Sequence, residues 1–209
     1  MRIARAKDKR GFSLVELLVV CAIIIVVLTL ILPNMAQTIA IVRLRGNMSS
    51  LAGLYQNGRM QAVRQNAFIQ LSHQMVNGQC VVYTDSAVSP QGLSATPAPP
   101  QLWLSSSLTC YVSPPTGSAP FKMDDTNMCT GTVDTTGGII VDDTPGDNTS
   151  FSPVGLPCSY TSPTTCPQQA FIYYFNYSSL LGAPKWGALA VSPAGRIKAC
   201  YWNGTTWGD

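Results

Sequence analysis

Glu16 is the residue of this sequence whose chemistry most needs explaining, because it is an acid inside a long apolar segment. The residues from 12 to 32 are apolar except at three positions, which are Ser13, Glu16 and Thr29. A carboxylate in a membrane-spanning segment costs about 2.5–3.5 kcal/mol on insertion scales, so it needs a cationic partner. Cleavage after Gly11 would supply that partner, because Phe12 would then carry an α-amine that is mostly charged at neutral pH. An ammonium about 4 Å from a carboxylate gains roughly 4 kcal/mol at an effective dielectric constant near 20, which offsets the insertion cost.

Two arrangements would bring the Phe12 amine to the Glu16 carboxylate. The two residues are four positions apart and can pair within one helix. The amine of a neighbouring copy would serve equally well and would also fix the axial stagger between subunits. In that arrangement Glu16 is an assembly residue, whereas the simplest alternative is a tolerated acid near the membrane interface.

The segment that contains Glu16 has the length of one membrane helix. Its 21 residues, at about 1.5 Å each, reach across a hydrocarbon core of roughly 30 Å. Residues 1–11 hold five basic residues and one acid, and the rest of the chain holds eight basic and nine acidic residues. This asymmetry places the leader in the cytoplasm and the chain after residue 32 outside. A secretory signal peptide fits less well, since its apolar core is shorter and ends at a small-residue cleavage site; a plain signal-anchor remains an alternative.

The residues around the Gly11–Phe12 bond resemble a known processing signal. This segment is similar to the class III signal of type IV pilins and type II secretion pseudopilins. It combines a basic leader, the run Gly11-Phe12-Ser13-Leu14, Glu16 at the fifth place after the glycine, and an apolar stretch. The resemblance implies that prepilin peptidase cuts after Gly11 and N-methylates Phe12. It also implies that Glu16 pairs with the N-terminus of a neighbouring subunit. Pro33 matches the proline that ends the most apolar part of the helix in that family, and a bend is expected there.

The pattern after Pro33 predicts a continuing amphipathic helix to about Gln65, followed by strands. Hydrophobic residues recur near helical spacing, with arginines and amides on the other faces. Asn77-Gly78 between two alternating segments predicts a hairpin, and Pro193-Ala194-Gly195 predicts another. Further strands are expected at 102–104, 108–112, 138–141, 170–176, 186–191 and 196–202. The stretches 86–100 and 142–165 are expected to be loops held by disulfides, and no internal repeat is evident.

The expected fold is therefore of the α+β class, with a long N-terminal helix packed on an antiparallel sheet. This is also the pilin-like fold that the resemblance implies. The expected organisation is a leader (1–11), a transmembrane assembly helix (12–32), its amphipathic continuation (33–66) and a periplasmic β-rich domain (67–209). The spacing of LAGLYQNGRMQAVRQNAFIQL and the end WGALAVSPAGRIKACYWNGTTW resemble the H-type pseudopilin (GspH) and FimT-type minor pilin group.

Six of the seven cysteines lie beyond the apolar segment, and their even number predicts up to three disulfides in an oxidising compartment. A zinc site is disfavoured, since no C-x-x-C pair occurs and His73 is the only histidine. Pairing Cys158 with Cys166 is the easiest local closure. The remaining expected pairs are Cys110 with Cys129 and Cys80 with Cys200, out of 15 possible arrangements.

Catalytic chemistry is not expected. No base lies beside a nucleophile and no pair of carboxylates is set for acid–base work, so the chain is not predicted to be an enzyme or to need a cofactor or metal. His73 is expected at a strand end in a structural or surface role. Six aspartates between 124 and 147 could offer oxygen ligands to calcium, but their spacing does not match an EF-hand loop, and a solvated acidic loop is favoured.

Arg196, Lys198 and Lys185 form a candidate DNA-binding set. In a strand Arg196 and Lys198 would share one face, with Lys185 on the other hairpin arm and several aromatic residues nearby. Cations interleaved with aromatic rings suit a nucleic acid backbone. The segment resembles the Gly-Arg-x-Arg motif with which some FimT-type pilins bind DNA, with Lys198 in place of the second arginine. A charged edge strand that avoids aggregation is the alternative interpretation.

The sequence thus predicts a minor pilin or pseudopilin of the inner membrane, a structural subunit of a type II secretion pseudopilus or type IV pilus. Its expected partners are other pilin subunits, prepilin peptidase and the membrane. The alternative is a pilus-borne DNA receptor for DNA uptake.

Overall fold

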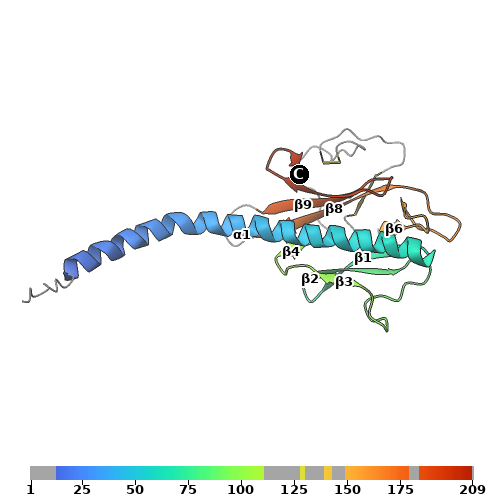
Figure 1. The fold of residues 1–209 in the computed structure, drawn as a ribbon, viewed down its shortest axis with the longest axis horizontal. Coiled ribbons are helices and arrows are strands. Elements are labelled where there is room, and N and C mark those ends of the chain that lie inside the picture. Colours follow the sequence, from blue (N-terminus) through green and yellow to red (C-terminus); the bar gives the residue numbers. More distant parts are fainter. Residues whose placement is uncertain (1–12, 111–127, 130–138, 143–148, 179–183, 209) are drawn as a thin grey trace, which may run out of the picture.

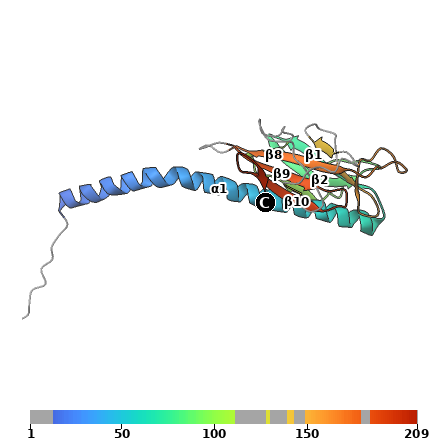
Figure 2. The same ribbon diagram turned by 90° about the horizontal axis from the view of Figure 1, so that it is seen from above.

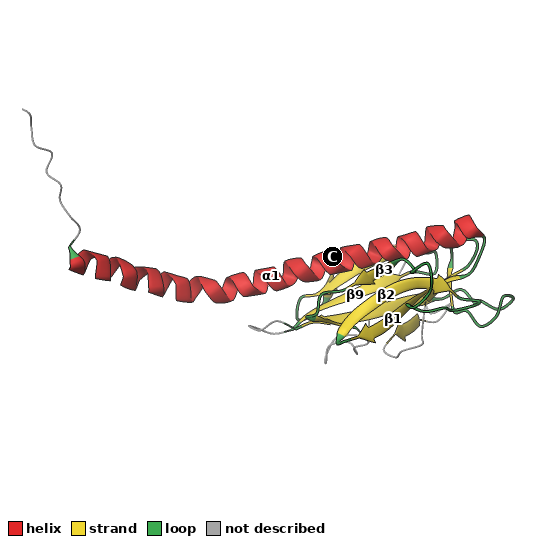
Figure 3. Ribbon diagram, turned by 90° about the horizontal axis from the view of Figure 1, so that it is seen from below, coloured by secondary structure: helices red, strands yellow, loops and turns green. Residues whose placement is uncertain are grey.

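The computed structural model describes residues 13–110, 128–129, 139–142, 149–178 and 184–208. One long helix, α1 (Leu14–Gln65), precedes all the strands. The first part of the helix projects away from the domain (Figure 1), and the second part lies across the strands, which are on one side of it in the view of Figure 3. The predicted α+β class, with a long N-terminal helix on antiparallel sheets, is confirmed.

Helix α1 is one continuous element of 52 residues that passes through Pro33. Figure 2 shows that its projecting part curves before it reaches the sheets. The helix ends where Asn66 adopts the left-handed conformation (φ 50°), a conformation that asparagine tolerates better than most residues. The amide of Ala67 donates to the carbonyl oxygen of Ala62 over 3.1 Å, which satisfies one of the last free carbonyl groups of the helix. The predicted helix end near Gln65 is confirmed.

The first sheet is built on the predicted Asn77-Gly78 hairpin. Strands β1 (Ile69–Val76) and β2 (Gln79–Ser86) pair antiparallel, and both turn residues have positive φ, as a two-residue hairpin turn requires. The strand order is β3-β2-β1-β6-β7, where the remaining members are β3 (Gln101–Trp103), β6 (Thr149–Phe151) and β7 (Pro157–Cys158).

The second sheet contains the C-terminal part of the chain in the order β11-β10-β9-β8-β4. Its strands are β4 (Leu108–Thr109), β8 (Ala170–Tyr177), β9 (Lys185–Val191), β10 (Ile197–Trp202) and β11 (Trp207–Gly208). Strand β5 (Ile139–Asp142) pairs with β8 in parallel, and it is the exception in an otherwise antiparallel sheet. The predicted hairpin at Pro193-Ala194-Gly195 joins β9 to β10.

The main core lies between α1 and both sheets. The helix contributes one stripe of buried side chains at spacings of three or four residues: Ala40, Leu44, Met48, Leu51 and Tyr55. Gly187 on β9 allows close approach, because a Cβ there would lie 3.3 Å from Leu44 Cδ1 and from Met48 Cγ. Gly58 does the same on the helix, where a Cβ would lie 3.1 Å from Leu71 Cδ1. These two glycines let the helix lie close to the sheets.

A second, smaller core covers the opposite face of the second sheet. Met128, Cys129 and Trp207 pack there against alanines of β9 and the side chain of Tyr174. The Cys129–Cys200 disulfide ties this cover to β10. Strand β8 is therefore buried on both faces, which explains its nearly uninterrupted apolar and aromatic sequence.

The structure pairs the six cysteines as Cys80–Cys110, Cys129–Cys200 and Cys158–Cys166. The predicted local closure of Cys158 with Cys166 is confirmed, and the other two predicted pairs, Cys110–Cys129 and Cys80–Cys200, are wrong. Cys80 on β2 of the first sheet is bonded to Cys110, which directly follows β4 of the second sheet, and Cys200 on β10 is bonded to Cys129, which covers the outer face of the second sheet. Packing of the segments brings each of these pairs within disulfide reach, with Cα–Cα distances of 6.0 Å for Cys80–Cys110 and 5.6 Å for Cys129–Cys200.

The expected loop 142–165 contains two strands, so that prediction is also wrong in part. Strand β6 lies next to β1 inside the first sheet, although its sequence is only Thr-Ser-Phe. Its residues are buried because β1 pairs with it on one side and β7 on the other. Such a short strand is stabilised by its neighbours, and its own sequence gives little indication of it.

Two turns share one sequence pattern and one geometry. They are SPVGL at 152–156 and SPAGR at 192–196. In each turn the glycine amide donates to the serine carbonyl oxygen, over 2.7 Å for Gly155 and 2.8 Å for Gly195, and both glycines have φ of +78°. The serine hydroxyl also accepts from the amide at the end of each turn. This is a three-residue hairpin loop with glycine at its left-handed position.

The guanidinium of Arg59 lies between these two glycine turns. Its Nη1 donates to the carbonyl oxygen of Gly195 over 2.8 Å. A Cβ on Gly195 would lie 3.0 Å from Arg59 Cζ, and a Cβ on Gly155 would lie 3.3 Å from Arg59 Nε. One helix side chain thus contacts a turn of each sheet, which ties the C-terminal half of α1 to both.

Candidate functional site

The projecting part of α1 exposes apolar side chains on all sides. Leu14 is 78% exposed, Leu18 63% and Ile25 62%, whereas Leu44 in the docked part is 3% exposed. The large hydrophobic residues described between 14 and 28 are all exposed. A helix that is apolar all round is normally buried in a protein core or a membrane. This surface therefore needs a covering that the described residues of the chain do not provide.

The apolar surface continues as a stripe past Pro33. Met35, Ile39 and Val42 are exposed, while Ala40 and Leu44 are buried against the domain. The helix thus changes from exposed on all sides to amphipathic near residue 40.

Glu16 lies in the first turn of α1 and is exposed. Negative charge is favourable at a helix N-terminus, because the first amides of the helix are not bonded within it. The neighbours of Glu16 on the helix are exposed leucines and valines, so its carboxylate lies within the apolar segment. Gly11 and Phe12 lie outside the described residues, as do residues 1–10, so the expected cleavage site and amine partner stay predictions.

Thr29 is the other polar residue of α1 within the apolar segment 12–32. Its Oγ1 donates to the carbonyl oxygen of Val26 over 2.7 Å. The hydroxyl is thus satisfied by its own helix, as is common for threonine in apolar surroundings.

Within the described residues, no helical window combines the length and hydropathy required of a membrane span.

His73 lies in the middle of β1 and is buried, so its expected place at a strand end is wrong. Its Nε2 is 3.2 Å from the hydroxyl oxygen of Tyr55, and its ring centroid is 4.6 Å from that of Tyr173. Burial lowers the pKa of His73 to about 3. The ring is therefore neutral at physiological pH and has a structural role between the helix and the two sheets.

Tyr173 extends this buried network to the first sheet. Its hydroxyl accepts a hydrogen bond of 2.8 Å from the backbone amide of Thr149 on β6 and also contacts the Thr149 hydroxyl. The rings of Tyr55 and Tyr173 meet edge to face at 5.4 Å. Side chains from α1, β1, β6 and β8 thus meet in one polar cluster inside the core.

The structure places the two candidate lysines on different faces of the second sheet. Arg196 directly precedes β10, and its carbonyl oxygen accepts a hydrogen bond of 2.9 Å from the amide of Ser192 on the other arm of the hairpin. Lys198 pairs with Ala190, and Lys185 lies five positions from Ala190 on the same strand, so the two lysines point to opposite faces of the sheet. Lys185 therefore does not share a face with Lys198, whereas the expected shared face of Arg196 and Lys198 stays a prediction.

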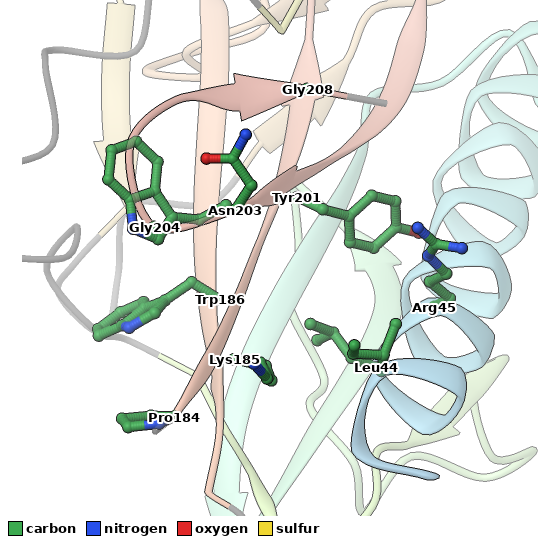
Figure 4. A pocket seen from close by; sticks show the side chains of 11 residues that line it. Leu44, Arg45, Pro184, Lys185, Trp186, Tyr201, Asn203, Gly204 and Gly208 are labelled. Carbon is green, nitrogen blue, oxygen red and sulfur yellow. The ribbon is translucent and has the colours of Figure 1, made fainter. Parts of the chain in front are cut away.

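A groove that sequence analysis missed lies where α1 meets the C-terminal hairpin. Its volume is about 660 Å³, and its lining includes Ile41, Leu44, Arg45, Lys185, Trp186 and Tyr201 (Figure 4). Arg45 Cζ lies 5.3 Å from the centre of the Tyr201 ring. Burial raises the pKa of Tyr201, and the positive charge of Arg45 opposes this shift. The residues come from segments about 140 positions apart in the chain, so no local spacing could have indicated the groove.

Metal binding finds no support in the described part of the chain, where no three histidine, cysteine or acidic side chains gather. Of the six aspartates considered as calcium ligands, only Asp142 falls among the described residues, at the end of β5.

The N-terminal segment matches a known family model. Residues 6–32 carry the prokaryotic N-terminal methylation motif. This methylation motif is a type IV pilin-like signal, and it contains the Gly11–Phe12 bond, Glu16 and the apolar segment. The domain that follows lies outside the match. No curated protein and no solved structure matches the chain, so the resemblance to H-type pseudopilins and FimT-type pilins has no support from relatives.

Proposed function

We propose that this chain is a minor pilin or pseudopilin. In this role prepilin peptidase cuts it after Gly11 and methylates Phe12, and the apolar helix holds the mature chain in the inner membrane with its domain in the periplasm. The chain then enters a type IV pilus or a type II secretion pseudopilus through the projecting helix. Its work is mechanical, and its partners are other subunits.

One observation carries this proposal: the methylation motif is continuous with a helix whose apolar side chains are exposed all round. A processing signal alone would fit any cleaved precursor. An uncovered apolar helix alone would fit a simple anchor. Together with Glu16 at the helix start, they fit a subunit that is first held by lipid and then by the helices of other copies. Three disulfides in the domain also suit an oxidising periplasm.

Mass spectrometry of the mature N-terminus tests this proposal. The full chain is produced with and without a prepilin peptidase, and its N-terminal peptide is sequenced. We expect an N-methylated Phe12 as the first residue only when the peptidase is present. A chain that still begins at Met1 in the presence of an active peptidase would contradict the proposal and favour a plain signal-anchor.

The DNA-receptor alternative has weaker support, because Lys185 and Lys198 leave opposite faces of their sheet. A gel-shift titration across salt concentrations, comparing the unaltered chain with an Arg196→Ala, Lys198→Ala double variant, tests it. Weak binding that the double variant leaves unchanged would eliminate these residues as a DNA site.

A further inference from the structure

We infer that the groove between α1 and the C-terminal hairpin binds the anionic headgroup of a membrane lipid. Its position, its charge and its aromatic lining support this inference. It rests on the proposed insertion of the projecting helix into the inner membrane.

The position of the groove is set by the helix that would enter the membrane. Ile41 and Leu44 form part of its lining, and Ile39 and Val42 on the same helix segment are exposed. Arg45 follows Val42 by three residues, which is about 5 Å along a helix. The cation of the groove therefore lies within one turn of the last exposed apolar residue of this stripe. Arg45 is 13 residues beyond the expected span 12–32, which is about 20 Å along a helix. The groove therefore lies at the end of the domain that faces the membrane, and its long cationic side chains can extend toward the phosphates of the headgroup layer.

The charge of the groove suits an anion. Arg45 and Lys185 approach it from α1 and β9, and none of the described residues that line it is acidic. Tyr201 pairs with Gly187, and Lys185 precedes Gly187 by two residues on β9. Lys185 is therefore on the same face of the sheet as Tyr201 and lies diagonally across from it, about 7–8 Å away. Tyr201 holds the Arg45 guanidinium over its ring, so both cations lie near one aromatic side chain. Two cations so placed can contact one phosphate group together.

The aromatic lining suits a membrane interface. Trp186, Tyr201 and Trp202 are half-buried lining residues; Tyr201 packs on the helix side of the sheet, and the two tryptophans pack on its other face, with Trp186 pointing away from Lys185 in Figure 4. Tryptophan and tyrosine are enriched where a membrane protein meets the headgroup layer, because their rings are apolar and their N–H or O–H groups are polar. A nucleic acid would also use cations and rings, but it would not require the adjacent apolar stripe on α1.

The wall of the groove is held by the turn after β10. The Asn203 side-chain oxygen accepts hydrogen bonds of 2.9 Å from the amides of Thr205 and Thr206, and its Nδ2 donates to the Thr206 hydroxyl over 3.1 Å. These bonds fix the turn that carries β11 back onto β10. The groove is thus formed before any ligand binds, which lowers the entropic cost of binding.

Lipid retention by the full chain in detergent tests the inference. Native mass spectrometry counts the phosphatidylglycerol and phosphatidylcholine molecules that stay bound. The test variant is Arg45→Gln, Lys185→Gln. The matched control is Arg64→Gln, Arg196→Gln, which removes the same charge from exposed positions outside the groove lining. Melting curves of both variants check that the fold is intact.

The unaltered chain and the control are expected to retain phosphatidylglycerol over phosphatidylcholine, and the groove variant is expected to bind it roughly 10- to 30-fold more weakly. Equal loss in both variants, or no preference between the lipids, would overturn the inference. Stronger competition by a single-stranded oligonucleotide than by phosphatidylglycerol would assign the groove to nucleic acid instead. If millimolar inorganic phosphate displaces the bound lipid and the chain shows no preference between the two lipids, the groove is a site for free anions, and the inference is overturned as well.

Vesicle flotation of the same proteins separates this inference from the proposed function. If the unaltered chain fails to float with vesicles of either lipid, the proposed membrane anchoring fails. If all the proteins float equally and the lipid preference is missing, only the groove inference fails.

Discussion

Arg59 on α1 donates a hydrogen bond of 2.8 Å from its Nη1 to the carbonyl oxygen of Gly195, 136 residues further along the chain. The same guanidinium lies against Gly155, so it contacts the turns of two different sheets. The two sheets are also linked directly, by the Cys80–Cys110 disulfide and by the hydrogen bond from the Thr149 amide on β6 to the Tyr173 hydroxyl on β8, so α1 is one of several connections between them. Arg59 is thus a central contact between the helix and the domain.

Replacing Arg59 by alanine is expected to lower the free energy of unfolding by about 1–3 kcal/mol, since a part-buried charged hydrogen bond is lost. Urea unfolding of the full chain in detergent, followed by tryptophan fluorescence, measures this change. Arg64→Ala is the matched control on the same helix and is expected to change stability by less than about 0.5 kcal/mol. Equal effects of the two substitutions would contradict the role given to Arg59.

The substitution Gly195→Ala is expected to lower the free energy of unfolding of the domain more than Gly92→Ala does. Both glycines have positive φ, which costs another residue about 1–2 kcal/mol. At Gly195 a Cβ would also lie 3.0 Å from Arg59 Cζ and 3.2 Å from the Gly155 carbonyl oxygen, whereas at Gly92 the space is open. Combining Gly195→Ala with Arg59→Ala isolates the contact in a double-mutant cycle. Strictly additive effects would show that the two residues do not interact.

The stability of the domain is expected to fall as the pH falls below about 6.5, because of His73. The unfolded chain binds a proton at this residue near pH 6.5. The folded chain does not until about pH 3, since burial lowers the pKa of His73. Stability is thus complete above pH 6.5 and decreases by about 2 kcal/mol between pH 7 and pH 5.

His73 is the only histidine of the chain, so its replacement isolates the effect. The His73→Gln variant is expected to be less stable at pH 7 but to lose less stability between pH 7 and pH 5. Urea unfolding at the two pH values measures the difference. Parallel pH profiles for the two proteins would refute the assignment to His73.

The three disulfides are expected to stabilise the domain in the order of the loops they close. The sequence separations are 71 residues for Cys129–Cys200, 30 for Cys80–Cys110 and 8 for Cys158–Cys166. Loop-closure entropy then gives roughly 4.4, 3.7 and 2.5 kcal/mol. Paired serine substitutions and urea unfolding measure the order, and peptide mapping without reduction checks the connectivity. A peptide that links Cys80 to Cys200 would contradict the structure.

Glu16→Ala is expected to reduce incorporation into filaments by tenfold or more, because the amine of a neighbouring Phe12 would lose its partner, worth roughly 4 kcal/mol at close range. The amount of the chain in sheared filaments, relative to the membrane fraction, measures this effect. Thr29→Ala is the control, since the Thr29 hydroxyl is bonded to its own helix. Undiminished incorporation of Glu16→Ala would remove the assembly role from this residue.

The sequence by itself determined the elements whose signals are local. Helix α1 follows from a hydrophobic period that neighbouring residues display, and its end at Asn66 follows from a residue that tolerates the left-handed conformation. The hairpin at Asn77-Gly78 follows from the backbone freedom of two adjacent residues. The Cys158–Cys166 bond closes a short loop. In each case the residues that interact are close in the chain, so their spacing carries the information.

Only the tertiary structure decided which distant segments meet. Strand order and register determine four features of this chain. They are the place of β6 beside β1, the pairing of Cys80 with Cys110, the opposite faces taken by Lys185 and Lys198, and the groove between Arg45 and Lys185. Between strands that are far apart in the chain, such as β1 and β6, no local turn fixes the register, and a shift of one residue would move every side chain of a strand to the other face. These features result from the packing of both sheets against one helix, which involves the whole chain at once.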